Sequence, residues 1–315
     1  MRVAVIGAGI MGSTIGSYLT DGGAEVWLVD PFKAHVDAIN KNGLDIIGYN
    51  RDKSSFEKNY RIKAVYSPDM IGGMADYVVY CVKMMHMSSA IESAKCISDT
   101  HTMQISLLNG VGSAELLLES YPADRVTYGI VSSGGAVIKP GRVERNFVPG
   151  FSFISVGPAS KRESLDLIVL KELLDKTDCT FSVYEDIDPI VWEKMIKNCT
   201  GNAICSVSRL PLGRMYNDDF GAELSEQIEK EVRAVAMAQG IHIDPTPRMK
   251  GKLPVDFPHM PSTAQDVIAQ KQTEIDTING AVSKLGKKYG VPTPYCDCMT
   301  MLIKLIENNY QYMRL

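Results

Sequence analysis

Long hydrophobic runs, a surplus of basic residues and cysteine pairs at metal-binding spacing are all missing from this 315-residue sequence. No apolar stretch approaches the roughly 20 residues that a membrane-spanning helix needs. Its 33 lysines and arginines are outnumbered by 37 acidic residues, so the net charge of -4 favours neither nucleic acid nor an anionic membrane as a partner. We expect no signal peptide, because the first strand is predicted from residue 2. The sequence therefore predicts a soluble, cytoplasmic protein that binds small molecules.

The seven cysteines are an odd number, and no two of them form a CxxC pair. Cys296 and Cys298 are separated by one residue, which is the wrong spacing for zinc, and no histidine is near them in sequence. The five histidines show no ligand spacing either. We therefore predict reduced thiols and no metal site.

The first thirty residues have the layout of a dinucleotide-binding site. Arg2–Ile6 is apolar enough for a strand that is buried on both faces, and a glycine-rich turn and a helix follow it. The first glycine of the turn permits a sharp bend, the second lets backbone N–H groups approach a pyrophosphate, and the third lets the helix pack closely on the strand. The cofactor-binding turn consists of Gly7, Ala8, Gly9, Ile10, Met11 and Gly12.

A second strand, Glu25–Val29, leads to Asp30, which lies eighteen residues after Gly12, as expected of an acid that binds the ribose hydroxyls. A carboxylate here disfavours the 2′-phosphate of NADP, because unit charges about 4 Å apart repel by on the order of 4 kcal/mol at an effective dielectric near 20. The nearest cations are Lys33 and Arg51, and Lys33 offsets part of this repulsion. The sequence thus predicts NAD(H) as the favoured cofactor and leaves NADP(H) open.

The chain is long enough for two domains. Residues 1–183 alternate strands and helices as in a mostly parallel sheet, which ends in antiparallel segments such as Phe151–Gly157. Residues 184–315 show long helical periodicities at Ile190–Val207, Phe220–Gln239, Ala264–Tyr289 and Asp297–Tyr310. We therefore predict an α/β Rossmann domain followed by an all-helical C-terminal domain.

Polar residues in the second domain are the candidates for chemistry. Lys194, Asn198 and Asn202 are spaced by four, which places them along one face of the predicted helix. Asparagine is a poor helix former, so this stripe is either a binding surface or a set of buried hydrogen-bonding groups, and the spacing alone does not decide between them. Ser262 is equally suited to capping a helix, and Glu274 to a solvated helix face.

Three motifs in this half of the chain resemble the ketopantoate reductase family. They are WxKxxxNxxxN from Trp192, STxxD from Ser262 and TEIDxING from Thr273, and the Leu108–Gly112 loop also matches. The resemblance spans most of the chain. It implies a Rossmann domain joined to a helical domain of the 6-phosphogluconate dehydrogenase type, an active site in the cleft, a role in pantothenate biosynthesis and a homodimer.

By that resemblance, Lys194 is the catalytic general acid that supplies a proton, or at least positive charge, to the ketone oxygen as hydride reaches its carbon. Glu274 is the second catalytic residue, a carboxylate that binds the substrate's hydroxyl. Lys83 contacts the cofactor, although a solvated lysine at a strand end is the alternative. The residues implied to bind substrate are Asn109, Asn198, Asn202 and Ser262, and Asn109 also lies beside the nicotinamide.

The resemblance also covers NAD-dependent D-2-hydroxyacid dehydrogenases built on the same scaffold. Glu274 and Asn202 are available for the 4-hydroxyl of ketopantoate, which keeps that substrate ahead of a bulkier apolar one. A non-catalytic NAD(H)-sensing protein is a third hypothesis, whose signature would be loss of Lys194 or Glu274, and both are present. We therefore predict a 2-dehydropantoate 2-reductase-like enzyme that transfers hydride from NAD(P)H to the C2 ketone of a small 2-keto acid, giving the D-2-hydroxy acid.

Overall fold

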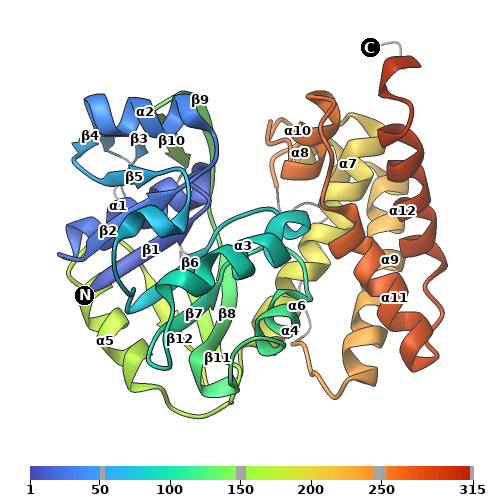
Figure 1. The fold of residues 1–315 in the computed structure, drawn as a ribbon. Helices are drawn as coiled ribbons and strands as arrows, with labels where there is room; N and C mark the ends of the chain where they lie inside the picture. Colours follow the sequence, from blue (N-terminus) through green and yellow to red (C-terminus); the bar gives the residue numbers. More distant parts are fainter. Residues whose placement is uncertain (50–53, 147–153, 245–250, 252, 313–315) are drawn as a thin grey trace. The chain divides into compact units, whose positions relative to one another are not determined.

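The computed structural model describes residues 1–49, 54–146, 154–244, 251 and 253–312 (Figure 1). The chain divides into two compact units. The first comprises Met1–Leu108 and Ser113–Ile187, and the second comprises Asn109–Gly112 and Asp188–Leu315. The loop Asn109–Gly112 therefore packs with the second unit although the first unit surrounds it in sequence. Among the described helices, none is long and apolar enough to cross a membrane.

An eight-stranded sheet in the order β12-β11-β8-β7-β6-β1-β2-β5 forms the centre of the first unit. Its first six strands in sequence pair in parallel, and β11 then runs antiparallel to β8. The predicted mostly parallel sheet with an antiparallel end is confirmed. The strands are β1 (Arg2–Ile6), β2 (Glu25–Val29), β5 (Lys63–Val65), β6 (Tyr77–Tyr80), β7 (Met103–Ser106), β8 (Val126–Val131), β11 (Ile154–Pro158) and β12 (Phe181–Val183).

Both faces of this sheet are buried, as the apolar sequence of β1 predicts. Val3 and Val5 belong to a core cluster with residues of α1 and α5, whereas Ala4 and Ile6 belong to a second cluster with residues of α3 and α4. The helices are α1 (Ile10–Asp21), α2 (Lys33–Asn42), α3 (Met87–Ala94), α4 (Ser113–Leu118) and α5 (Leu165–Leu174).

A second sheet of four strands, in the order β4-β3-β10-β9, also belongs to the first unit. Sequence analysis did not predict it, because it pairs β3 in parallel with β10, a strand far along the chain, and β9 begins with two glycines. Arg145 of β10 is buried with its guanidinium 4.7 Å from the Tyr18 ring centroid and 4.0 Å from that of Phe56. The strands are β3 (Leu44–Tyr49), β4 (Ser55–Tyr60), β9 (Gly134–Lys139) and β10 (Arg142–Asn146).

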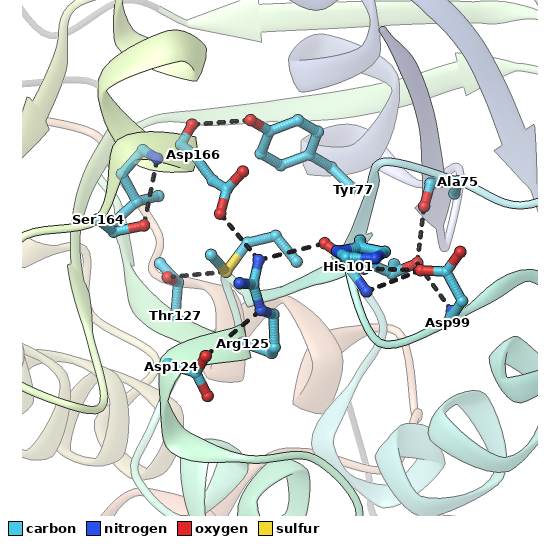
Figure 2. Close-up of polar contacts among 12 residues, drawn as sticks. Ala75, Tyr77, Asp99, His101, Asp124, Arg125, Thr127, Ser164 and Asp166 are labelled. Carbon is cyan, nitrogen blue, oxygen red and sulfur yellow. Dashed lines mark hydrogen bonds and ion pairs between the residues drawn. The ribbon is translucent and has the colours of Figure 1, made fainter.

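The start of α5 is tied to the large sheet by polar contacts, which Figure 2 shows. Arg125, just before β8, donates through Nη1 to Oδ2 of Asp166 at 3.0 Å and to the carbonyl of His101 at 3.4 Å. The hydroxyl of Tyr77 on β6 donates to the Asp166 carbonyl at 2.7 Å. Ser164 caps the helix by accepting from the Leu167 N–H. These contacts fix α5 against the strands that it covers.

The second unit is helical over its described residues, as predicted. Its core contains Trp192, Ile228, Val282 and Ile303, one from each of four helices. In Figure 1 these helices run in colour from yellow to red. They are α6 (Asp188–Lys197), the π-helical turn η5 (Asn198–Asn202), α7 (Ala203–Ser208), α8 (Leu212–Asn217), α9 (Asp219–Ala238), α10 (Ser262–Ile268), α11 (Asn279–Tyr289) and α12 (Pro294–Glu307).

The prediction of one helix over Ala264–Tyr289 is wrong. The helix α10 ends at Ile268 and α11 starts at Asn279, and between them lies only a short 3-10 turn, η6 (Ile275–Thr277). The backbone leaves the helical conformation at Gln270, whose φ is +54°. Side chains of α12 bind the intervening residues and hold them outside any helix.

Candidate active site

The glycine-rich turn of the first unit has the geometry that its three glycines predict. Gly7 has a φ of +95°, a conformation that only glycine adopts readily. A Cβ added at Gly12 would lie 1.8 Å from the Gly7 carbonyl oxygen, so this position admits no side chain. A Cβ added at Gly9, the N-cap of α1, would meet no described atom within 4 Å. Among the described residues, space is therefore open beside Gly9 at the start of α1, where the first backbone N–H groups have no acceptor within the helix.

Asp30 is joined to this turn. Its Oδ2 accepts from the Ala8 N–H at 2.9 Å, and its Oδ1 accepts from the Phe32 N–H at 2.9 Å. Each carboxylate oxygen keeps capacity for a further hydrogen bond. Asp30 therefore holds the shape of the glycine turn and still presents acceptors to a hydroxyl-bearing ligand.

His35 on α2 is a neighbour of Asp30 that sequence analysis missed. The residue is 3% exposed, and its Nδ1 accepts from the Gly141 N–H at 3.1 Å. Burial lowers its pKa from the ordinary value of 6.5, while the charge of Asp30 acts in the opposite direction. The ring is consequently neutral at pH 7 and does not compensate the carboxylate. Its place on the buried face of α2, beside Val36, could have drawn attention to it.

Three basic residues were expected near the cofactor. Lys33 is exposed at the first position of α2, and Arg51 lies outside the described residues. Lys83 follows β6 and is half-buried. The end of β6 adjoins the glycine turn, because a Cβ at Gly7 would lie 2.9 Å from the carbonyl oxygen of Cys81.

The second unit brings Lys194 and Asn109 together. Lys194 Nζ on α6 donates to Asn109 Oδ1 at 2.8 Å. Asn109 follows Ser106, the last residue of β7, by three positions. Burial lowers the pKa of Lys194 to about 8, against the charge of Glu274, which raises it, and together with that of Lys197, which lowers it. A lysine with a pKa near neutrality is suited to giving and taking a proton.

Glu274 lies in the non-helical stretch between α10 and α11, directly before η6, and not on a helix as the sequence suggested. It is half-buried, and its charge acts on Lys194. Its carbonyl oxygen accepts from the N–H and the hydroxyl of Thr277, both at 3.0 Å. The carboxylate is therefore set on a fixed turn beside the lysine.

The two asparagines occupy the π-helical turn η5. Asn202 is 6% exposed, and Asn198 is half-buried. Turns of this kind are rare and occur frequently at functional sites. Ser262, the first residue of α10, is exposed, and the side-chain cap suggested for it is absent, because Pro261 is the N-cap. The helix α10 packs against both α7 and η5, so Ser262 belongs to an element adjoining the asparagines.

These residues fit a dinucleotide cofactor and a small polar substrate. The open position at Gly9, the N-terminus of α1 and the acceptors of Asp30 match a pyrophosphate followed by a ribose. In the part of the chain that the structure describes, no three His, Cys, Asp or Glu residues are grouped to hold a metal ion. The seven cysteines, all within the described residues, are free thiols.

Two family models match the chain. The model for ketopantoate reductase PanE/ApbA matches residues 3–159, and the model for its C-terminal domain matches residues 186–307. The 2-dehydropantoate 2-reductase of Lactococcus lactis subsp. lactis (strain IL1403) is 28% identical to this chain over 309 residues. That similarity covers 96% of this chain and 97% of the relative.

Solved structures of the same fold cover the chain almost completely. A ketopantoate reductase of the PanE/ApbA family from Ralstonia eutropha JMP134 is 28% identical, with a TM-score of 0.86, over 99% of this chain and 100% of that one. The ternary structure of D-mandelate dehydrogenase with NADH and anilino(oxo)acetate is 25% identical, with the same TM-score and coverage. The two kinds of neighbour correspond to the two enzyme hypotheses drawn from the sequence.

The glycines of the turn separate a structural role from a ligand-binding role. Gly9→Ala adds a methyl group into open space, so we expect thermal unfolding within about 2 °C of wild type, since about 1 kcal/mol shifts the midpoint of a domain this large by only 2–4 °C. Fluorescence titration should nevertheless show NADH binding weakened by at least about tenfold, if a pyrophosphate packs there. Gly12→Ala should instead lower the unfolding midpoint by several degrees, because the methyl group meets the Gly7 carbonyl. Normal NADH binding by Gly9→Ala would contradict this assignment of the turn.

Proposed function

Because the chain belongs to the ketopantoate reductase family, we propose that it reduces the C2 ketone of ketopantoate, or of a close 2-keto acid, to the D-2-hydroxy acid. The resemblance predicted from sequence motifs is confirmed by the family models, and the chain is accordingly an oxidoreductase. The reduced nicotinamide, when bound, supplies the hydride. We assign the cofactor to the Gly7–Gly12 turn, Asp30 and Lys83, and the substrate to the polar residues around Lys194.

The pairing of Lys194 with Asn109 is the observation that carries this proposal. Hydride addition converts a ketone oxygen into an alkoxide, which needs a proton or a positive charge aimed at it. Lys194 is held at 2.8 Å from a neutral acceptor, and burial lowers its pKa to about 8. The ammonium is thus charged at pH 7 and still gives up its proton readily. Asn109 orients the ammonium without neutralising it, and Glu274 keeps it protonated.

We assign Glu274 to the substrate's 4-hydroxyl, Asn198 and Asn202 to its polar groups, and Ser262 to its carboxylate. The stretch before η6 gives Glu274 a fixed backbone, and the π-helical turn places two amides in consecutive turns of one element. A carboxylate that accepts from a substrate hydroxyl discriminates against a substrate that lacks this hydroxyl, because the hydrogen bond to it is then lost. This favours ketopantoate over the apolar keto acid that a D-mandelate dehydrogenase would take.

We propose NADH as the preferred form of the cofactor. Asp30 is fixed by the Ala8 and Phe32 N–H groups, and the neighbouring His35 is neutral at pH 7. The exposed Lys33, the first residue of α2, is a cation that could offset the carboxylate toward a 2′-phosphate. One exposed lysine contributes little, since surface pairs are worth about 0–1 kcal/mol.

The outer face of α12 supports the homodimer that the family resemblance implies. Met301 is 65% exposed and Leu305 is 61% exposed, and they are one helical turn apart. Exposed apolar side chains grouped on one helix face are typical of protein interfaces.

Titration of Lys194 should control the rate. Below pH 8 the ammonium is present, so kcat/KM for keto-acid reduction should be flat, and above pH 8 it should fall about tenfold per pH unit. Oxidation of the hydroxy acid needs the neutral amine and should rise through the same pH. Lys194→Ala should lose about 10²–10⁴-fold in kcat. As a control, Lys194→Arg keeps a charge that does not titrate, so its residual activity should show no fall between pH 8 and 10.

The same assays distinguish the hypotheses when ketopantoate, ketoisovalerate and phenylglyoxylate are compared. We expect ketopantoate to give the highest kcat/KM. A preference for phenylglyoxylate would identify a D-2-hydroxyacid dehydrogenase instead. Tight NADH binding without turnover of any keto acid would support a sensing protein, and activity of Lys194→Ala within a few-fold of wild type would refute the acid role.

Removing the charge of Asp30 should shift cofactor preference. Asp30→Asn keeps the size of the side chain, and we expect the ratio of NADPH to NADH affinity, measured by fluorescence titration, to rise by about tenfold, which corresponds to about 1.4 kcal/mol. Asp37→Asn serves as the control. It removes the charge of an exposed carboxylate on α2, and it should leave the ratio of NADPH to NADH affinity unchanged. Tighter binding of NADPH than of NADH by the wild-type protein would overturn the proposal.

The assembly can be measured by light scattering at micromolar concentration, where we expect twice the mass of the chain. Met301→Asp should shift the protein toward monomer, because it places a charge on the apolar face. Met237→Asp alters an equally exposed methionine on α9 and should leave the mass unchanged. A monomeric wild-type protein would show the dimer proposal to be wrong.

A further inference from the structure

Glu274 is placed by residues that lie far from it in sequence. It belongs to the stretch between α10 and α11, which makes only a 3-10 turn of its own. Such a stretch has little intrinsic stability, so its conformation must be imposed by contacts with other elements. The contacts come from the last turns of α12.

Glu307, the last residue of α12, binds the residue that precedes Glu274. Its Oε1 accepts from both the N–H of Thr273 at 2.7 Å and the hydroxyl of Thr273 at 2.5 Å. The Thr273 hydroxyl also accepts from the N–H of Ile275 at 3.2 Å. The Glu307 side chain is 8% exposed and Thr273 is 2% exposed. One carboxylate therefore fixes the backbone on both sides of Glu274 through a single threonine.

Lys304, one turn earlier on α12, extends the same network. Its Nζ donates to Oε2 of Glu307 at 2.8 Å and to Oδ2 of Asp276 at 2.8 Å. Burial acts against its charge, but the hydrogen bonds that Lys304 donates to Asp276 and Glu307 more than compensate and raise its pKa. The ion pairs thus bind the stretch a second time, two residues after Glu274.

The far end of the stretch supports the partner of Lys194. The carbonyl oxygen of Thr277 accepts from the N–H of Val111 at 3.3 Å. A Cβ added at Gly110 would lie 2.3 Å from that oxygen, so the Asn109–Gly112 loop rests directly on the end of η6. Asn109, which accepts from Lys194, is the residue before Gly110. The turn fixed by α12 consequently carries Glu274 and supports Asn109.

We infer that Glu307, acting through Thr273, is the positioning residue of this site, and that it holds Glu274 in register with the substrate hydroxyl and with Lys194. The inference rests on the proposed function for the identity of that hydroxyl. Both oxygens of Glu307 are engaged by Thr273 and Lys304, so we assign it no direct contact with substrate or cofactor. Its effect on the reaction is therefore indirect and should be selective for what Glu274 binds.

Thr273→Val tests the inference with the smallest change of shape. It removes the hydroxyl that accepts a hydrogen bond from the Ile275 N–H and donates one to Glu307. In steady-state assays we expect KM for ketopantoate to rise about tenfold, because a misplacement of about 1 Å can cost up to 10²-fold. The KM for ketoisovalerate, which lacks the hydroxyl, should stay within about twofold, as expected when only the hydroxyl contact is lost. Thr273→Ser keeps the hydroxyl, so the KM values for ketopantoate and ketoisovalerate should both stay near those of wild type.

Glu307→Gln tests the same link from α12 and should give the same selective rise in KM. Its amide cannot accept from both Thr273 and Lys304, since one of its two terminal atoms is a donor. Should this buried change prevent folding, Lys304→Gln weakens the network at a more exposed position and should raise the ketopantoate KM two- to threefold, the effect of roughly 0.5 kcal/mol.

Glu231→Gln is the matched control. Glu231 on α9 is 7% exposed and likewise accepts two N–H groups, those of Tyr295 and Cys296 at the start of α12, both at 2.8 Å. It should lower thermal stability comparably without changing the ratio of the two KM values. The inference is overturned if Thr273→Val and Glu307→Gln leave that ratio within twofold of wild type, or if Glu231→Gln changes it equally.

A second readout keeps this inference distinct from the proposed function. If wild type shows no preference for ketopantoate over ketoisovalerate, the assignment of Glu274 to a substrate hydroxyl fails. The positioning role is then decided by the pH dependence of kcat/KM for whichever keto acid is reduced. Glu274 raises the pKa of Lys194, whereas Lys197 lowers it. Displacing Glu274 by Thr273→Val should therefore move the fall in kcat/KM to lower pH. A fall at the same pH as in wild type would refute the positioning role of Glu307.

Discussion

The partial burial of one ammonium group, that of Lys194, is the interaction on which the proposed chemistry of the second unit depends. A lysine charge removed from water is costly unless it has acceptors and opposite charge nearby. Lys194 has Asn109 as its acceptor at 2.8 Å, and the charge of Glu274 limits the fall of its pKa to about 8. Asn109 is a neutral acceptor, so it orients the ammonium without cancelling its charge. In the proposed mechanism, a charged group whose pKa is about 8 can both bind the ketone oxygen and give up its proton.

The first unit has a different electrostatic task under the proposed function, which is to attract a pyrophosphate and to disfavour a 2′-phosphate. The first turn of α1 presents unsatisfied N–H groups in front of the open space at Gly9. Asp30 accepts from the Ala8 N–H in the glycine turn that leads into α1, so its negative charge is part of the structure of that glycine turn. Replacing this acid during adaptation to another cofactor would therefore disturb the turn as well as the charge. Asp30 therefore contributes both to the proposed cofactor preference and to the stability of the glycine turn.

Much of this arrangement could be predicted from short-range patterns. The strand, glycine turn, helix and acid at the start of the chain are contiguous, so their periodicity and spacing predicted the parallel sheet. The motif matches named Lys194, Asn109 and Glu274 as site residues. The second sheet and the break at Ala269–Ile278 were missed, because both depend on partners far along the chain, β10 for β3 and Glu307 for Thr273. His35 was missed for the same reason, since Gly141 is its partner. The spacing of four between Asn198 and Asn202 is also that of an ordinary α-helix, so it could not predict the π-helical turn.

The loop Asn109–Gly112 packs with the second unit, although residues on both sides of it pack with the first. The chain therefore passes between the units at Leu108, again at Gly112 and finally at Ile187, instead of once. A gene fission or recombination event at the last of these points would leave the lysine on one polypeptide and its acceptor on the other. The two halves are consequently expected to be inherited as a single block, and grafting this helical unit onto another nucleotide-binding unit would require transfer of the loop as well.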